Sequence, residues 1–306
     1  MTSSLSRRVA AEFVGTLFLL AAVVGSGIMG ERLSGGNVAI ALLANTLATG
    51  TALVAIILAF GPISGSHLNP AVTLVGAWTG EISWRHALPY IAAQTAGAFS
   101  GVAVAHFMFG APVFSASIHV RSGPAQIFSE FVATFGLLAV IWGCVRTRPA
   151  AVPFAVGTYI TAAYWFTAST SFANPAVTLA RSATNTFAGI RPVDVIPFVA
   201  AELAGAFAAA LLFQWLFPKR IADTAPLPHA PSSTLPSPSP RAPTRSPSTP
   251  PVRTTPSSAR TTPSPSSKLR ASQSDESQAG SLVTGRSNLP RGTRTLRRSF
   301  LHPRSG

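Results

Sequence analysis

The chain has 306 residues, of which 47% are hydrophobic and only 10% are charged, and its formal net charge is +14. So few charges exclude an ordinary soluble domain, in which about 25% of the residues are charged. The single cysteine, Cys144, excludes an intramolecular disulfide and a zinc site built from several cysteines. Residues 1–220 hold eleven basic and six acidic residues, a net of +5, whereas residues 221–306 hold twelve and three, a net of +9.

Six apolar stretches in residues 1–220 approach or exceed the roughly 20 residues that an α-helix needs to cross a bilayer. Arg7 and Arg8 precede the first stretch, as in a signal peptide, but its length and weak cleavage site predict a helix that is retained. The fifth stretch is the shortest. In chain order the predicted spans are Val9–Met29, Asn37–Phe60, Ala87–Phe109, Gln126–Val145, Ala151–Thr167 and Val193–Phe217.

Basic residues in the short loops predict the orientation, because such residues concentrate on the cytoplasmic side. With the N-terminus inside, most of the basic residues also lie inside. We therefore expect both termini to be cytoplasmic and the chain to span the cell (inner) membrane several times. The predicted inner group is Arg7, Arg8, Arg85, Arg146, Arg148, Lys219 and Arg220, and the outer group is Arg32, Arg121 and Arg191.

The first half of the membrane region is repeated in the second half. The run AEFVGTLFLLAAV from Ala11 is echoed by SEFVATFGLLAVI from Ser129, and AAQTAGAF from Ala92 by AAELAGAF from Ala200. Between these echoes, NPAVTL occurs at residues 69–74 and again at 174–179. Three crossings per half place the copies in opposite orientations, which predicts an inverted repeat.

Each Asn-Pro-Ala motif is predicted to start a short helix, because Asn caps a helix and Pro suits its first position. The apolar runs that follow are too short to span, so each is expected to form a half-helix that enters and leaves on one side. Non-helical backbone survives at that depth only beside protein or a water-filled cavity. The predicted pore constriction is therefore Asn69, Pro70, Ala71, Asn174, Pro175 and Ala176.

Two inverted half-helices would bring their N-termini together near the midplane of the membrane. There the positive ends of the helix dipoles and the amides of Asn69 and Asn174 would face one spot. A neutral polar molecule can accept hydrogen bonds from both amides, whereas a cation meets a positive potential, and a proton relay through water is interrupted. The pattern predicts a pore for uncharged solutes.

From Arg8 to Arg220 the chain resembles the aquaporin, or major intrinsic protein, family, on the AEFVGT opening, SGSHLNPAVT and the second NPA. The run NPAVTLAR is similar to that of bacterial aquaglyceroporins associated with arsenic resistance. The resemblance implies an all-α membrane protein with six transmembrane helices and two re-entrant half-helices. It also implies a homotetramer with one passive pore per subunit. No cofactor and no bound metal are expected, and no enzymatic activity, because no nucleophile, base and orienting group cluster in the sequence.

The resemblance places the narrowest point on the outer side, with Thr49, Ser171 and Val177 at three of its four positions. For the fourth, alignment from Gly157 gives Tyr164 and counting back from Asn174 gives Ala162; we prefer Tyr164. Water-selective and glycerol-conducting members usually carry Arg at the position of Val177. Water-selective members usually carry a bulky aromatic residue at the position of Thr49. A wider filter for glycerol, urea, trivalent arsenite or antimonite, and water is therefore expected.

Five further residues have two interpretations each. Glu12 and Glu130 are expected to accept hydrogen bonds from the re-entrant backbone rather than to relay protons. The same structural role is expected for Gln94 and Glu202. His67 is read as pore-lining rather than as a packed histidine.

Arg181 lies four residues beyond Val177 on the same helical face. Its side chain leans toward the helix N-terminus and so has the reach to restore part of the filter. The alternative is a place in the outer mouth or its wall, which we favour.

Residues 221–306 are rich in Pro, Ser, Thr and Arg and are predicted to form a disordered basic cytoplasmic tail, beside a channel domain of residues 1–220. Its charge is suited to anionic membrane lipid. A nucleic-acid partner is not expected, because no fold or aromatic platform accompanies the charge. A shifted reading frame is a third interpretation.

The leading hypothesis is thus a passive channel for small neutral solutes. The alternatives are a water-selective aquaporin, a secondary transporter, which also uses inverted repeats, and a non-conducting structural membrane protein.

Overall fold

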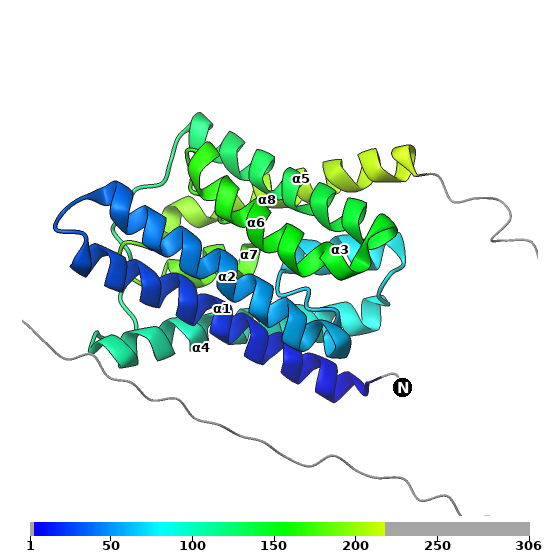
Figure 1. Cartoon of the computed structure of the whole chain (residues 1–306), viewed down its shortest axis with the longest axis horizontal. Coiled ribbons are helices and arrows are strands. Elements are labelled where there is room, and N and C mark those ends of the chain that lie inside the picture. The colour runs from blue at the N-terminus through cyan, green and yellow to red at the C-terminus, as the bar shows by residue number, and fades with distance from the viewer. Residues whose placement is uncertain (1–2, 218–306) are drawn as a thin grey trace, which may run out of the picture. The chain divides into compact units, whose positions relative to one another are not determined.

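The computed structural model describes residues 3–217, which form six long α-helices, two short ones and one 3-10 turn (Figure 1). The predicted tail and the inner basic residues Lys219 and Arg220 lie outside the described residues. The elements are α1 (Leu5–Leu33), α2 (Val38–Ser64), α3 (Pro70–Thr79), α4 (Trp84–Phe109), α5 (Pro124–Thr147), η1 (Pro149–Ala151), α6 (Val152–Phe166), α7 (Pro175–Arg181) and α8 (Pro192–Leu216).

The helices confirm the predicted fold class. Five of them, α1, α2, α4, α5 and α8, are 24 to 29 residues long and apolar enough to cross a membrane. The remaining long helix, α6, has only 15 residues and follows directly on η1. It corresponds to the fifth apolar stretch of the sequence, which was also the shortest. Figure 1 shows α1 beginning and α8 ending at the same end of the bundle, as an even number of crossings requires.

The packing follows the repeat in the sequence. In the first half α1 packs on α2 and α4, and in the second half α5 packs on α6 and α8. The half-helices α3 and α7 contact each other. Each also contacts both α4 and α8, so that each half-helix packs against a long helix of its own half and a long helix of the other half. The two halves therefore share one core, with the half-helices at its centre.

The end of α2 differs from the prediction. The predicted span stops at Phe60, but α2 continues through Pro62 to Ser64. Gly65, at φ +87°, then ends the helix in the left-handed conformation that favours glycine. The non-helical part of the first re-entrant segment is therefore only residues 65–69, shorter than its composition suggested.

The two halves meet most closely where α2 crosses α6, at Gly50 and Gly157. A Cβ on Gly157 would lie 2.6 Å from the Gly50 carbonyl oxygen and 2.5 Å from Val54 Cγ2. A Cβ on Gly50 would lie 2.9 Å from the Gly157 carbonyl oxygen. Each glycine thus makes room for the backbone of the other helix, as small residues do in membrane helix interfaces.

Gly157→Ala should therefore destabilise the folded protein by about 1–3 kcal/mol, the usual cost of forcing an extra carbon into a packed core. The matched control is Gly143→Ala in α5, where the nearest atom to a new Cβ is a Phe213 ring carbon at 3.5 Å. The control should be neutral or slightly stabilising, because Ala favours a helix over Gly. Thermal unfolding in detergent measures both, and equal midpoints for the two variants would contradict the close crossing.

Candidate functional site

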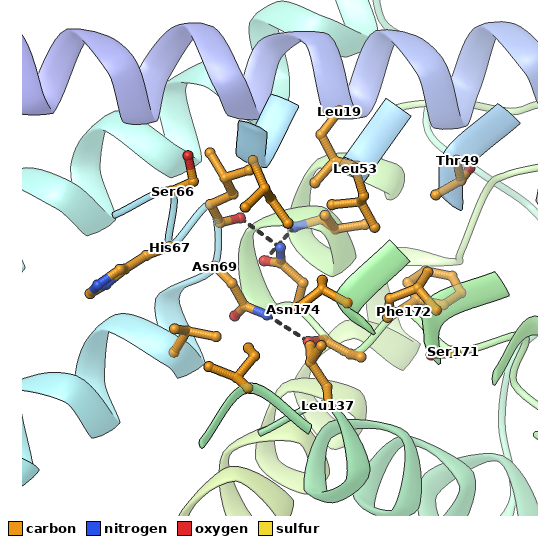
Figure 2. Close-up of a pocket in the computed structure, with 18 of the residues that line it drawn as sticks. Leu19, Thr49, Leu53, Ser66, His67, Asn69, Leu137, Ser171, Phe172 and Asn174 are labelled. Carbon is orange, nitrogen blue, oxygen red and sulfur yellow. Dashed lines mark hydrogen bonds between the residues drawn. The ribbon is translucent and has the colours of Figure 1, made fainter. Parts of the chain in front are cut away.

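An elongated cavity runs between the helices and past both half-helices. Along α6 its lining extends from Val152 to Tyr164, about 18 Å at 1.5 Å per residue. In Figure 2 His67 lies toward one end, Thr49 and Ser171 lie toward the other, and two asparagines lie between them. Its walls combine apolar side chains of α1, α2, α5 and α6, such as Leu19, Leu53, Leu137 and Ile160, with the polar backbone of the two re-entrant segments.

Asn69 and Asn174 cap the half-helices. Asn69 Oδ1 accepts from the Ala71 N–H at 2.8 Å, and Asn174 Oδ1 accepts from Ala176 at 3.0 Å and Val177 at 3.3 Å. Both caps have extended backbone, and a proline follows each at the first helical position, where its missing N–H is not needed. The short apolar runs form helices here because each asparagine accepts a hydrogen bond from backbone N–H groups of the first turn, which have no partner within the helix.

The asparagine amides also join the two halves. Asn69 Nδ2 donates to the Ala173 carbonyl at 2.7 Å, and Asn174 Nδ2 donates to the Leu68 carbonyl at 2.8 Å (Figure 2). An amide nitrogen carries two hydrogens, and within residues 3–217 neither Nδ2 has a second protein acceptor. One hydrogen of each asparagine therefore locks the opposite segment, and the other is left to face the cavity.

The other four residues of the predicted constriction have a different role. Pro70 is buried beside Asn69, and Ala71 and Ala176 are buried in the core. Together with Pro175, none of them is among the residues that line the described cavity. They start and pack the half-helices, while the asparagines face the cavity.

The re-entrant segments have matching backbones. Ser66 and Leu68, three residues and one residue before Asn69, have φ of +46° and +52°, and Ser171 and Ala173, at the same places before Asn174, have +50° and +51°. A left-handed conformation costs an L-residue roughly 1–2 kcal/mol. Four such residues need a compensating interaction from the surrounding structure.

Two buried carboxylates supply that interaction. Glu12 accepts the N–H groups of His67 at 2.9 Å and Leu68 at 2.7 Å, and Glu130 accepts those of Phe172 at 2.9 Å and Ala173 at 2.7 Å. Charged acceptors make the stronger hydrogen bonds. Neither glutamate lines the cavity, so the geometry is that of a backbone support and not of a proton path along the cavity.

Gln94 and Glu202 form hydrogen bonds with threonines of the two half-helices. Gln94 Nε2 donates to Glu12 at 2.8 Å and to Thr73 Oγ1 at 2.9 Å. At the equivalent place in the second half, the Thr178 hydroxyl donates to Glu202. Each pair links a half-helix to the long helix that packs against it.

The structure brings all four predicted filter positions to the cavity wall, namely Thr49, Tyr164, Ser171 and Val177. The Tyr164 hydroxyl lies 3.4 Å from Thr49 Oγ1. Ala162, the alternative on the same helix, is exposed on the outside of α6. The geometry therefore favours Tyr164 at the fourth position.

His67 lines the inner part of the cavity. Its Nδ1 lies 3.1 Å from Thr73 Oγ1, and its ring meets Tyr90 edge-on at 5.5 Å. Glu81, which the sequence analysis did not select, also lines the cavity and accepts a hydrogen bond from Trp142 Nε1 at 2.7 Å. It is the one carboxylate among the residues that line the described cavity.

At the outer end Arg181 lies in the cavity wall, whereas the sequence left open a place in the filter and a place in the outer mouth or its wall. Two residues that sequence reasoning missed accompany it: Phe172, which also lines the cavity, and Arg121, whose guanidinium lies 5.0 Å from the Phe172 ring centroid. Burial lowers the pKa of Arg121, which lies in the loop between α4 and α5. The run SFANPA contained the only local signal, an aromatic residue directly beside a filter position.

A bundle of membrane-spanning helices around a long cavity, with two capped half-helices meeting at its middle, defines a transmembrane channel. The family model for "Major intrinsic protein" matches residues 1–171. The chain belongs to the major intrinsic protein family, whose members are channels for small neutral solutes and not enzymes.

Individual relatives agree with this assignment. The chain is 57% identical over 212 residues to the aquaglyceroporin AqpS of Rhizobium meliloti (strain 1021), an alignment that covers 69% of this chain and 91% of that protein. Aquaporin NIP6-1 of Arabidopsis thaliana is 36% identical over 140 residues, 45% of each chain. The X-ray structure of the aquaglyceroporin from Plasmodium falciparum matches with a TM-score of 0.55 at 22% identity, over 72% of this chain and all of that one, which supports the fold alone.

Proposed function

We propose that the chain is a passive channel whose widened outer filter admits glycerol, urea, undissociated trivalent arsenite or antimonite, and water. The observation that carries the proposal is that small Val177 and Thr49 both line the cavity, where a long basic side chain would narrow the passage. The similarity of the chain to the aquaglyceroporin of Rhizobium also supports a solute larger than water.

The lining is suited to neutral molecules that carry hydroxyl groups. One side offers apolar side chains, and the other offers the free amide hydrogens of Asn69 and Asn174. A solute that keeps its carbon skeleton on the apolar side and its oxygens on the polar side loses little hydration energy. A cation finds positive helix ends at the same place and is opposed there.

The test is a stopped-flow panel on proteoliposomes of the purified protein, with water, glycerol, urea and arsenite as solutes and empty liposomes as the baseline. Fluxes should exceed the baseline and follow only the gradient of the solute itself. Accumulation driven by a proton or sodium gradient would instead establish a secondary transporter. Swelling with water but with none of the other three solutes would establish a water-selective aquaporin.

We further infer that four copies assemble with one pore each, in the cell (inner) membrane, with both termini cytoplasmic. Large apolar side chains cover the outer face of the helices in residues 3–217, as contact with lipid or with neighbouring copies requires. Examples with at least half of their surface exposed are Phe18 (56%), Leu47 (51%), Phe107 (84%), Phe128 (65%), Val193 (69%) and Trp215 (76%).

Residues 1–220 are proposed as the complete channel domain and residues 221–306 as a separate tail. Deleting residues 225–306 should leave oligomer assembly and permeability per channel within about twofold of the full chain, because α8 ends at Leu216. Size-exclusion chromatography and stopped-flow on matched amounts of protein measure both. A truncated protein that no longer assembles would show that the tail belongs to the folded unit.

A further inference from the structure

Arg181 is a buried cation without a carboxylate partner in the described part of the chain. Its side chain is only 2% exposed, and its Nε donates to the Ala188 carbonyl. In residues 3–217 the one ion pair within 4.0 Å joins Arg191 and Asp194. A buried guanidinium is costly unless water or a ligand meets its remaining donors, so its free side must face an accessible space.

That space is the outer part of the cavity. Arg181 lines it, and the guanidinium carbon lies 3.4 Å from the centroid of the Phe172 ring, a stacked cation–π contact. Figure 2 shows Phe172 beside Ser171, at the Thr49 end. Arg181 starts about 6 Å beyond Val177 along α7, but helical side chains lean back toward the helix N-terminus, and its guanidinium lies over Phe172, the residue next to the filter position Ser171.

The guanidinium keeps most of its donors free. Arginine has five N–H groups, and of those of Arg181 only the Nε one has a protein acceptor within residues 3–217. The neighbouring Ser171 hydroxyl is buried and likewise has no partner there. Two polar groups that the protein leaves unsatisfied therefore line the same stretch of the cavity, where a solute would meet them.

A second arginine fixes the stack from behind. Arg121 faces the Phe172 ring at 5.0 Å, and its Nε donates to the Gly189 carbonyl at 2.8 Å and its Nη1 to the Ser169 carbonyl at 3.0 Å. Its Nη2 also lies 3.5 Å from the Phe187 carbonyl. Arg121 is thus committed to protein oxygens and acts as a positioning residue, whereas Arg181 remains available.

We propose that Arg181 is the specificity-determining cation of the outer filter, in place of an arginine at the position of Val177. Set one helical turn further out and stacked on Phe172, it leaves the filter wide at Val177 and still presents guanidinium donors and positive charge. The matching solute is a neutral molecule with two or more adjacent hydroxyl oxygens. This inference rests on the proposed channel function.

The experiment compares Arg181→Gln with the parent in proteoliposomes, measuring water permeability, the glycerol-to-water permeability ratio and the leak of protons and potassium ions. Water permeability should stay within about twofold, the glycerol-to-water ratio should fall, and the cation leak should rise about tenfold or more, because a unit charge beside the path is lost. Simple misfolding would lower every flux together and would leave the ratio unchanged.

The matched control is Arg32→Gln. Arg32 also stacks on a phenylalanine, Phe109 at 5.2 Å, and donates to a backbone carbonyl at 3.1 Å, but it is exposed and does not line the cavity. Arg32→Gln should leave the glycerol-to-water permeability ratio and the cation leak at the values of the parent. An Arg181→Gln channel that also matches the parent in both would overturn the proposal.

If Arg181→Gln does not fold, Arg181→Lys decides. Lysine retains the charge but not the planar fork of donors, so cation exclusion should be kept while the glycerol-to-water ratio falls. An unchanged ratio would overturn the proposal. A parent protein that conducts water but no glycerol would count against the proposed solute range alone, because the cation leak still tests Arg181.

Discussion

Val177→Arg should reduce glycerol and arsenite permeability by about tenfold or more relative to water permeability, a change that corresponds to about 1.4 kcal/mol. Val177 is 5% exposed and lines the outer part of the cavity. Its backbone N–H already bonds to Asn174 Oδ1, so the start of α7 does not depend on the side chain. A long side chain at this place would fill the space opposite Thr49, which water can still pass.

The matched control is Val177→Ile, which adds one methyl group without charge or donors. It should lower glycerol permeability by at most about fivefold, because one methylene in an apolar passage is worth only about 1 kcal/mol. Stopped-flow light scattering with water, glycerol and arsenite gives the three permeabilities for each protein. Equal solute permeability before and after the arginine substitution would show that this position does not set the filter.

Asn174→Asp should raise the permeability to potassium ions and protons by about tenfold or more, because a carboxylate offsets the positive potential of the two helix N-termini. Aspartate caps a helix as well as asparagine does, so α7 should still form. The substitution also removes the donor to the Leu68 carbonyl, a bond of 2.8 Å. We therefore expect a somewhat less stable protein in addition to the leak.

Two further variants test whether the leak depends on where the new carboxylate lies. Asn69→Asp removes the equivalent bond to Ala173 and should leak similarly, as the pseudo-symmetry requires. Asn37→Asp makes the same change at the exposed cap of α2 and should leak no more than the parent. If folded Asn174→Asp is as tight to cations as the Asn37→Asp control, the electrostatic account of the barrier is wrong.

The sequence by itself determined the architecture. The spans, the inverted repeat and the half-helices follow from apolar length, from the echoed runs and from the capping chemistry of Asn-Pro. These are local properties, because a bilayer demands about 20 apolar residues wherever they occur and a cap acts within its own first turn. The place where α2 ends was the exception, since a proline near a helix end is tolerated when the neighbouring structure supports it.

Only the tertiary structure decided how the site is held. The bonds from Asn69 to Ala173 and from Asn174 to Leu68 join residues 104 and 106 positions apart, and no local pattern selects backbone carbonyls as partners. Alignment from Gly157 already favoured Tyr164 over Ala162, and the structure adds that Tyr164 lines the cavity whereas Ala162 is exposed.

The same reason applies to Arg181. Its place depends on the ring of Phe172, whose backbone N–H is held by Glu130, and on Arg121, which comes from the loop between α4 and α5 and lies against the same ring. The position of a residue on a helix predicts the direction in which its side chain points. The groups that the side chain contacts determine where its end lies.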